Sequence, residues 1–211
     1  DVAAIVLAAG SASRFRASAG KNGPVTKLVA LLDGKALVRR VAEAALASRA
    51  RPVIVVTGHA RAEVEAALVG LPLRFIHNAD FASGLASSLK AGIAAAPADA
   101  QGALILLGDM PDLSVGVIDA LIAARAAHPG AKAIVPLFGG KRGNPALVSR
   151  TLFQAVAQLE GDIGARALIA AAGADIVETP VDDAAIHFDV DTPEVLAARQ
   201  AAPARGSKGA G

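Results

Sequence analysis

The chain has 211 residues, of which 54% are hydrophobic and 19% are charged, a balance that supports one well-filled core and excludes a disordered chain. Its formal net charge is +2 and only 3% of its residues are aromatic, which argues against nucleic acid as a partner. The absence of cysteine excludes disulfides, thiolate metal sites, iron–sulfur clusters and a cysteine nucleophile.

Nothing in the sequence indicates a membrane partner. No apolar run reaches the roughly 18–20 residues that a membrane span needs, and no basic region precedes an apolar one at the N-terminus. We therefore expect a cytoplasmic protein.

Short apolar runs rich in valine and isoleucine recur along the chain. They predict strands at 3–7, 52–56, 72–76, 102–107, 132–137, 144–149 and 185–190. Alanine-rich amphipathic stretches predict helices at 36–48, 61–70, 87–96, 115–127, 150–158 and 164–172, with a last helix after 189–193. This alternation predicts an α/β fold with a largely parallel sheet covered on both faces. We expect one domain over 1–200 and a mobile tail at 201–211.

In such a sheet, ligands bind beyond the carboxyl ends of the strands. The first strand ends in "AAIVLAAGSASRF", where the small residues from Ala8 to Ser11 bare the backbone and Arg14 follows. Main-chain N–H groups can then reach phosphate oxygens, and Arg14 can add charge-assisted bonds. The stretch lacks the glycine spacing of a dinucleotide fingerprint, and 18–22 is not a Walker loop. An ordinary glycine turn with a solvated arginine is the alternative.

Two later segments carry further binding candidates. In "FIHNADFASGLASSLKAGI", Asn78 follows a strand, and Gly84 precedes a helix whose first turn offers Ser87 and Ser88. Helix N-termini attract anions, although simple capping would explain these residues as well. The segment "GKRGNPALVS" at 140–149 is a second polar candidate, with a plain hairpin as the alternative.

Carboxylates follow two of the apolar runs. Asp109 in "LILLGDMPDL" directly follows a buried strand, at a position where a carboxylate could hold Mg²⁺. The alternative is a turn or helix-cap role for Asp109, and Asp112 and Ser114 already suit capping. In "HFDVDTPE", Asp189 and Asp191 would share one side of a strand and repel each other unless a cation lies between them. Asp191 could also begin a helix, and the two roles can coexist.

The four histidines show no paired metal spacing, and no Ser/His/Asp arrangement is visible. Hydrolase chemistry of that kind is therefore not expected.

These motifs, in this order, resemble the MobA-like nucleotidyltransferase family. "VLAAGSASRF" followed by "TKL" is similar to its LAAG-x-S-x-R-[MF] signature and lysine, and "GDMP" and "DVDTPE" are similar to its metal elements. "IHNADFASGLASSL" and "GKRGNPAL" resemble the line that transfers cytidylyl groups to molybdopterin, and "GDIGARAL" at 161–168 echoes a family loop of structural or acceptor-side role. The resemblance covers roughly residues 2 to 200. It implies a three-layer Rossmann-like open sheet of the nucleotide-diphospho-sugar transferase type, mostly parallel with an antiparallel strand.

The resemblance also implies roles for individual residues. Arg14, Lys27 and Asp109 would be catalytic, Gly143, Asn144 and Pro145 would bind the acceptor, and Lys141 and Arg142 could meet an acceptor phosphate. Asp109 and Asp191, or Asp189 in place of Asp191, would bind Mg²⁺, for which Mn²⁺ can substitute. Since Arg16 and a longer loop interrupt the family spacing, Lys21 is an alternative to Lys27. The nucleotide-binding set would be Leu7, Ala8, Ala9, Gly10, Ser11, Arg14, Lys27, Thr57, Gly58, Asn78, Gly84, Ser87, Ser88 and Gly108.

The reaction implied is the transfer of CMP from CTP to the phosphate of molybdopterin with release of pyrophosphate. "LAAG" resembles the cytidylyl-transferring type, where guanylyl-transferring members have "LAGG". The implied partners are CTP or another nucleoside triphosphate, molybdopterin or its molybdenum form, and a recipient molybdoenzyme or its chaperone. The alternatives are transfer to a sugar or polyol phosphate, a redox relative, and a non-catalytic nucleotide-binding relative.

Overall fold

The computed structural model describes residues 1–11, 15, 17 and 23–202. Arg14, Arg16 and Lys21 lie outside the described residues, as do residues 203–211 of the expected tail. No helix within the described ranges is long and apolar enough to cross a membrane.

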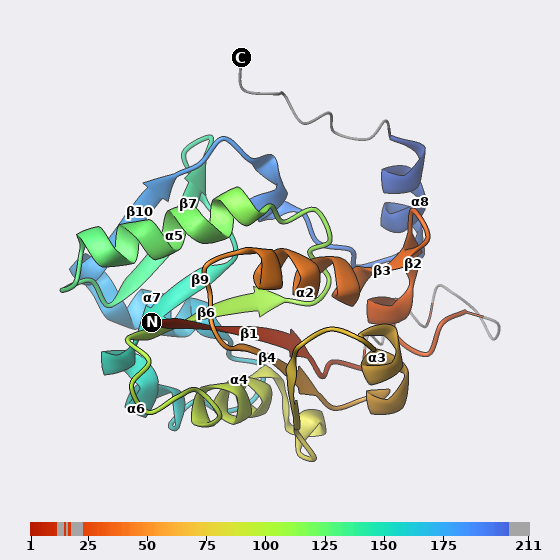
Figure 1. Cartoon of the computed structure of the whole chain (residues 1–211), viewed down its shortest axis with the longest axis horizontal. Helices are drawn as coiled ribbons and strands as arrows, with labels where there is room; N and C mark the ends of the chain where they lie inside the picture. Colours follow the sequence, from red (N-terminus) through yellow and green to blue (C-terminus); the bar gives the residue numbers. More distant parts are fainter. Residues whose placement is uncertain (12–14, 16, 18–22, 203–211) are drawn as a thin grey trace.

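One large sheet organises the described part of the chain (Figure 1). Its order is β10-β7-β9-β6-β1-β4-β5, with β8 paired to β7. Among the described strands, β9 runs antiparallel to both of its neighbours, β6 and β7, and the short β8 runs antiparallel to β7. The strands are β1 (Val2–Ala8), β4 (Val53–Thr57), β5 (Arg74–His77), β6 (Gly102–Leu107), β7 (Ala133–Phe138), β8 (Lys141–Arg142), β9 (Ala146–Ser149) and β10 (Ile176–Pro180). A separate small hairpin joins β2 (Leu31–Leu32) to β3 (Lys35–Ala36).

Helices cover both faces of this sheet, which gives three layers. One face carries α2 (Leu37–Ala47), α3 (Arg61–Ala67) and α5 (Val115–Ala127). The other carries α4 (Leu85–Ala94), α6 (Phe153–Val156) and α7 (Ala165–Ala172), while α8 (Pro193–Ala201) lies beside β2. Short 3₁₀ turns complete the chain: η1 (Lys27–Val29), η2 (Phe81–Ser83), η3 (Arg150–Leu152), η4 (Gly173–Asp175) and η5 (Ala184–His187).

The inner strand β1 shows why this sheet is buried on both sides. Its residues are apolar without a break, and successive side chains point to opposite faces. Ala4 and Val6 enter the core under α2 and α5, whereas Ile5 and Leu7 enter the core under α4. The α/β class with a mostly parallel sheet is confirmed, including its antiparallel strand.

The predicted strand at 185–190 is wrong. Residues 184–187 form η5, which begins where Asp183 Oδ1 accepts a hydrogen bond of 2.9 Å from the N–H of Ala185. The edge of the sheet beside β7 is taken instead by β10, which pairs with it in parallel. The sequence did not predict β10 because Glu178, Thr179 and Pro180 interrupt its apolar pattern. Predicted helix 150–158 is likewise shorter, with η3 followed by one turn of α6.

The packing of α4 on the sheet leads to the first testable prediction. A β-carbon at Gly92 of α4 would overlap the side chain of Ile5 in β1 and would lie 3.1 Å from Val56 Cγ2. Gly92→Ala should therefore lower the free energy of unfolding by about 1–3 kcal/mol, through overpacking. Urea denaturation checks it, with Gly116→Ala in α5 as the control, because the nearest atom that the described residues bring to a β-carbon there, Ser114 Oγ, lies at 3.8 Å. A Gly92→Ala protein as stable as the parent would contradict this packing.

Candidate active site

The ends of β1 and β6 meet at the edge of the sheet where the site is built. The N–H of Gly108, just after β6, donates a 3.1 Å hydrogen bond to the carbonyl of Leu7 in β1. A β-carbon at Gly108 would lie 3.0 Å from that carbonyl oxygen and 3.2 Å from Leu28 Cδ2. The missing side chain thus lets β6 turn tightly beside β1, which brings Asp109 to the end of β1.

A second segment, far along the chain, is fastened to Asp109. The N–H of Val190 donates a 2.9 Å hydrogen bond to the carbonyl of Asp109. Val190 itself is fully buried in an apolar cluster with Phe15, Leu32 and other residues. Because the chain is extended here, its neighbours Asp189 and Asp191 point the other way, as the sequence predicted, although 185–190 is not a strand.

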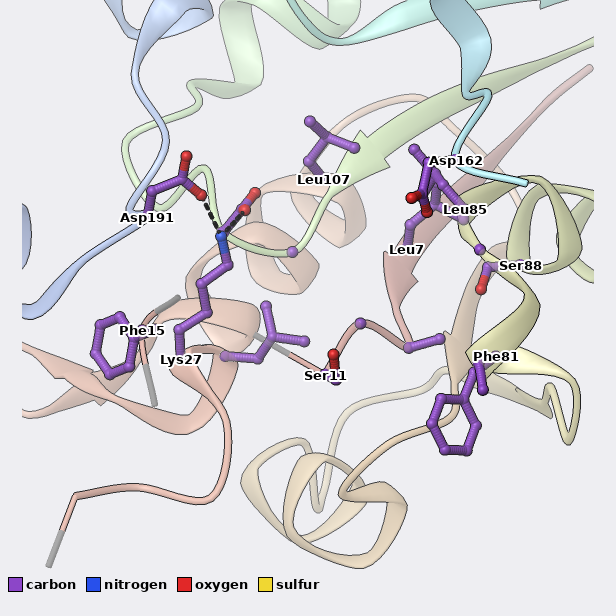
Figure 2. A pocket seen from close by; sticks show the side chains of 17 residues that line it. Leu7, Ser11, Phe15, Lys27, Phe81, Leu85, Ser88, Leu107, Asp162 and Asp191 are labelled. Atoms are coloured by element: carbon purple, nitrogen blue, oxygen red, sulfur yellow. Dashed lines mark hydrogen bonds and ion pairs between the residues drawn. The ribbon is translucent and has the colours of Figure 1, made fainter. Parts of the chain in front are cut away.

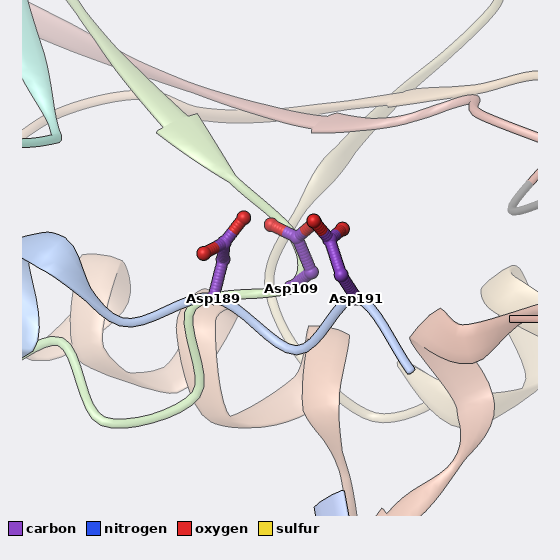
Figure 3. A group of neighbouring side chains, drawn as sticks. All are labelled: Asp109, Asp189 and Asp191. Carbon is purple, nitrogen blue, oxygen red and sulfur yellow. The ribbon is translucent and has the colours of Figure 1, made fainter. Parts of the chain in front are cut away.

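The result is a cluster of three carboxylates, the acidic trio of Asp109, Asp189 and Asp191. One oxygen from each lies within 4.8 Å of the others. Figure 3 shows the three side chains projecting to the same side, with Asp109 between the other two. Like charges at this separation repel, so the trio needs a compensating cation.

Lys27 supplies a positive charge to the trio. Its Nζ lies 2.6 Å from Asp109 Oδ2 and 2.7 Å from Asp191 Oδ1, and its side chain is only 15% exposed (Figure 2). The backbone holds it in place: Lys27 begins η1, Thr26 Oγ1 caps that turn, and Leu28 is buried in the core. The ammonium group of Lys27 therefore occupies the space in front of two of the three carboxylates.

The ionisation of these groups reflects the same geometry. Burial by itself would lower the pKa of Lys27, but the charges and hydrogen bonds of Asp109 and Asp191 raise the pKa above its ordinary value. Burial raises the pKa of Asp189, and the negative charges of Asp191 and Asp109 raise it further. Lys27 therefore stays positively charged. Because Lys27 pairs with Asp109 and Asp191, the negative charge of Asp189 is the least compensated of the three.

The trio also fits a divalent cation. Asp109 Oδ1 is buried and has no hydrogen-bond partner among the described residues, and a buried carboxylate oxygen left unpaired is costly. Carboxylate oxygens are the protein ligands that hard divalent cations such as Mg²⁺ and Mn²⁺ take. The donor set and its unpaired oxygen therefore suit a metal ion.

A cavity of about 650 Å³ opens beside the trio at the carboxyl edge of the sheet. Most of the predicted nucleotide-binding and metal residues line it: Leu7, Ala9, Gly10, Ser11, Lys27, Gly84, Ser88, Gly108, Asp109 and Asp191. Its wall also contains residues that the sequence did not single out for this role, among them Phe15, Phe81, Leu85, Leu107 and Asp162. Figure 2 shows Lys27 and Asp191 at one end, and Phe81, Leu85, Ser88 and Asp162 at the other.

Other predicted binding residues lie away from this cavity. Ala8 faces the core under α2, and Thr57 is fully buried at the end of β4. Gly58 is not part of the cavity wall. It packs against Ala9, since a β-carbon at Gly58 would lie 2.8 Å from Ala9 Cβ. Their part in binding remains a prediction, as does that of Arg14, which lies outside the described residues.

Asn78 has a positioning role that sequence reasoning did not foresee. Its Nδ2 donates hydrogen bonds to Ser87 Oγ at 2.8 Å and to Ser88 Oγ at 3.0 Å. Its own N–H donates to the carbonyl of Thr57 at 2.8 Å. Asn78 thereby ties the end of β4 to the first turn of α4, and with Ser87 it lines a separate hollow on the other side of that helix.

Two of the three predicted acceptor residues lie in a different cavity, of about 470 Å³. Of this cavity and the one beside Lys27, we call the 650 Å³ cavity the larger cavity and the 470 Å³ cavity the smaller cavity. Gly143 and Asn144 line it with Asp189, while Pro145 does not. Arg142 and Arg166 contribute positive charge to its wall, and Lys141 is not part of it. Since Asp189 also belongs to the acidic trio, the trio lies between the two cavities.

The segment 161–166 reaches both cavities. Asp162 lines the larger one and Arg166 the smaller one. The sequence offered the signal, since "GDIGAR" stands out as a polar glycine motif, but periodicity alone could not tell which side chains face a ligand.

Comparison with known proteins gives one family. The profile of the MobA-like NTP transferase domain matches residues 4–176. The chain is 34% identical to purine catabolism protein PucB of Bacillus subtilis (strain 168) over 90% of this chain and 91% of that protein. It is 32% identical to nicotine blue oxidoreductase of Paenarthrobacter nicotinovorans over 92% and 94%. It is 31% identical to molybdenum cofactor cytidylyltransferase of Escherichia coli (strain K12) over 67% and 70%.

The chain also matches part of a larger relative. It is 33% identical to bifunctional protein GlmU of Leifsonia xyli subsp. xyli over 65% of its own length, but it spans only 28% of that protein.

Solved structures share the fold. The homologue of Mycobacterium tuberculosis Rv0371c from Mycobacterium sp. strain JC1 superposes with a TM-score of 0.77 at 29% identity, covering 94% of this chain and 96% of the other. A nucleotidyl transferase from Methanothermobacter gives a TM-score of 0.80 at 24% identity, covering 94% and 95%. The fold is therefore that of the nucleotide-diphospho-sugar transferases.

The ion pairs of Lys27 make a prediction about metal binding. Lys27→Met removes the ammonium group that competes for the carboxylates, so the affinity for Mn²⁺ in the absence of nucleotide should rise about tenfold. Titration followed by electron paramagnetic resonance of free Mn²⁺ measures it. Lys35→Met is the control, because Lys35 pairs with Glu43 at the surface. Equal or weaker Mn²⁺ binding by Lys27→Met would show that Lys27 does not compete with a metal.

Proposed function

This chain belongs to the MobA-like NTP transferase family and is a nucleotidyltransferase, and we propose that it transfers CMP from CTP to the phosphate of molybdopterin. One observation carries the proposal. Lys27, Asp109 and Asp191 line the larger cavity, whereas Asp189, the third member of the acidic trio, lines the smaller one. A triphosphate in the first cavity and an anionic acceptor in the second would meet at these charges.

The chemistry needs no nucleophile from the protein. An oxygen of the acceptor phosphate attacks the α-phosphorus of the triphosphate, the bond from that phosphorus to the bridging oxygen breaks, and pyrophosphate leaves. Negative charge gathers on the phosphate oxygens during this step, and groups placed in advance to neutralise it are effective in a partly dry site. Lys27 and the bare backbone of Ala9, Gly10 and Ser11 supply such groups.

A divalent cation is the expected cofactor, with Mg²⁺ proposed and Mn²⁺ as a substitute. Asp109 and Asp191 would hold it, with Asp189 as a third ligand or an alternative to Asp191. When bound, it would draw charge from the phosphate oxygens and orient the leaving pyrophosphate. Because Lys27 contacts two of these carboxylates, we expect it to turn toward the phosphates once the cation binds.

The smaller cavity supports the acceptor half of the proposal. Its wall combines Arg142 and Arg166 with Asn144 and apolar side chains such as Val135 and Ile169. Guanidinium groups bind phosphate through paired hydrogen bonds, while an apolar wall suits a flat heterocycle. Arg142 is partly engaged, since its Nε lies 2.7 Å from Glu178 Oε1.

The choice of CTP and molybdopterin over other substrates is supported by one relative and one motif. The relative is the molybdenum cofactor cytidylyltransferase of Escherichia coli, and the motif is "LAAG" at 7–10. The recipient of the product would be a molybdoenzyme or its chaperone. Because nucleoside triphosphates are made and used in the cytoplasm, the location we propose is cytoplasmic.

A redox activity is the second candidate, favoured by the similarity to nicotine blue oxidoreductase over nearly the whole chain. The sequence has no G-x-G-x-x-G motif for a dinucleotide cofactor. Thermal shift separates the candidates: a nucleotidyltransferase is stabilised by CTP with Mg²⁺, whereas stabilisation by NADPH alone would favour the redox activity.

Asp109 is the residue on which the metal role depends most. Asp109→Asn should lower metal-dependent release of pyrophosphate from CTP and molybdopterin by at least about 100-fold, because a neutral amide compensates a cation poorly. A coupled pyrophosphate assay measures the rate, and circular dichroism verifies folding. The matched control is Asp99→Asn, an exposed residue outside the cavities. Turnover at the parent rate by Asp109→Asn would refute the role.

Arg166 tests the acceptor cavity. Arg166→Gln should raise the KM for molybdopterin about tenfold and leave the KM for CTP unchanged, because the lost guanidinium faces the smaller cavity only. Steady-state kinetics with each substrate varied in turn provide the readout. Arg61→Gln, which breaks only a surface pair with Glu65, serves as control. An equal rise in both KM values would contradict a separate acceptor cavity.

A further inference from the structure

The larger cavity has two chemically different ends. Lys27 and Asp191 mark the charged end, where the proposed function places the triphosphate. At the opposite end, Phe81 and Leu85 offer apolar surface, and Leu85 is 37% exposed. A nucleotide whose phosphates lie at the charged end would place its base between these apolar side chains.

Two polar side chains also face this apolar end: the carboxylate of Asp162 and the hydroxyl of Ser88 (Figure 2). Ser88 is only 4% exposed, and its Oγ accepts a hydrogen bond from Asn78. Accepting that bond leaves the hydroxyl proton available to a ligand. Asp162, when ionised, can only accept hydrogen bonds. The end of the cavity thus offers one donor and one strong acceptor.

The backbone of Asp162 is held in place by tight packing between two loops. The N–H of Ala86, in the first turn of α4, donates a 3.0 Å hydrogen bond to the carbonyl of Gly161. A β-carbon at Gly84 would overlap that same carbonyl group, and Gly84 has a φ of +108°, a value that side chains other than hydrogen disfavour. Glycine at 84 therefore lets the loop lie against the start of α4, with Asp162 in the wall of the cavity.

We propose that Asp162 reads the exocyclic amino group of the nucleotide base, and that this side chain lets the enzyme select cytosine against uracil. The inference rests on the proposed function, since it takes the larger cavity as the nucleotide site. Cytosine carries an amino group, which can donate a hydrogen bond to the carboxylate of Asp162. Its neighbouring ring nitrogen N3 can accept a hydrogen bond from the hydroxyl of Ser88. Uracil presents a carbonyl oxygen in place of the amino group, which a carboxylate repels.

The Asp162→Asn variant tests this directly. An amide keeps the shape of the side chain, but it can rotate to donate to the carbonyl of uracil. We expect the parent protein to bind CTP at least about tenfold more tightly than UTP, and Asp162→Asn to reduce this ratio to about one. Isothermal titration with each triphosphate and Mg²⁺ measures both affinities. The matched control is Asp182→Asn, an exposed aspartate outside the cavities, which should keep the parent ratio.

The outcomes separate this inference from the proposed function. If the parent protein binds neither triphosphate in the presence of Mg²⁺, the nucleotide site itself is wrong. If it binds CTP, but Asp162→Asn keeps the parent ratio of CTP to UTP affinity, the nucleotide site stands and the role of Asp162 is refuted. A lost preference in Asp162→Asn, with the control unchanged, supports the role.

Discussion

Three carboxylates and one ammonium group share a small, partly buried space, and this constraint shapes the rest of the site. Two unit charges about 5 Å apart interact by about 3 kcal/mol at an effective dielectric of 20, so Asp109, Asp189 and Asp191 cannot stay close together without a cation. Lys27 compensates two of them in the structure. A divalent ion would compensate the trio more fully and release Lys27 for phosphate. In this proposal, the same carboxylates would serve the site both with and without the metal ion.

The fold produces this convergence from parts that are distant in sequence. Asp109 comes from the end of β6, Lys27 from a turn after β1, and Asp189 and Asp191 from an extended segment before α8. Backbone contacts place each of these side chains. The close contact of Gly108 with β1 places Asp109, and the hydrogen bond from Val190 to Asp109 places Asp189 and Asp191. The turn that Thr26 caps places Lys27. In the proposed function, the cavities on either side of the trio would give the two substrates a common meeting point.

Much of this arrangement is visible in the sequence, but the contacts are not. The order of strands and helices follows from apolar periodicity, and the alternation of Asp189, Val190 and Asp191 predicts that the two carboxylates share a side. The same periodicity misleads at 185–190, because an extended segment that buries Val190 has the apolar pattern of a strand. The ion pairs of Lys27, the bonds of Asn78 and the place of Asp162 depend on tertiary packing, which local patterns do not encode.

We propose that Lys27 and a metal ion bind the same carboxylates in turn. A crystal structure with Mn²⁺ and a non-hydrolysable analogue of CTP tests it most directly, because anomalous scattering locates the ion independently of the protein. We expect an Mn²⁺ peak coordinated by Asp109 and by Asp191 or Asp189, with Lys27 Nζ moved to the phosphates. A Lys27 still paired with Asp109 and Asp191, with Mn²⁺ bound elsewhere, would contradict it.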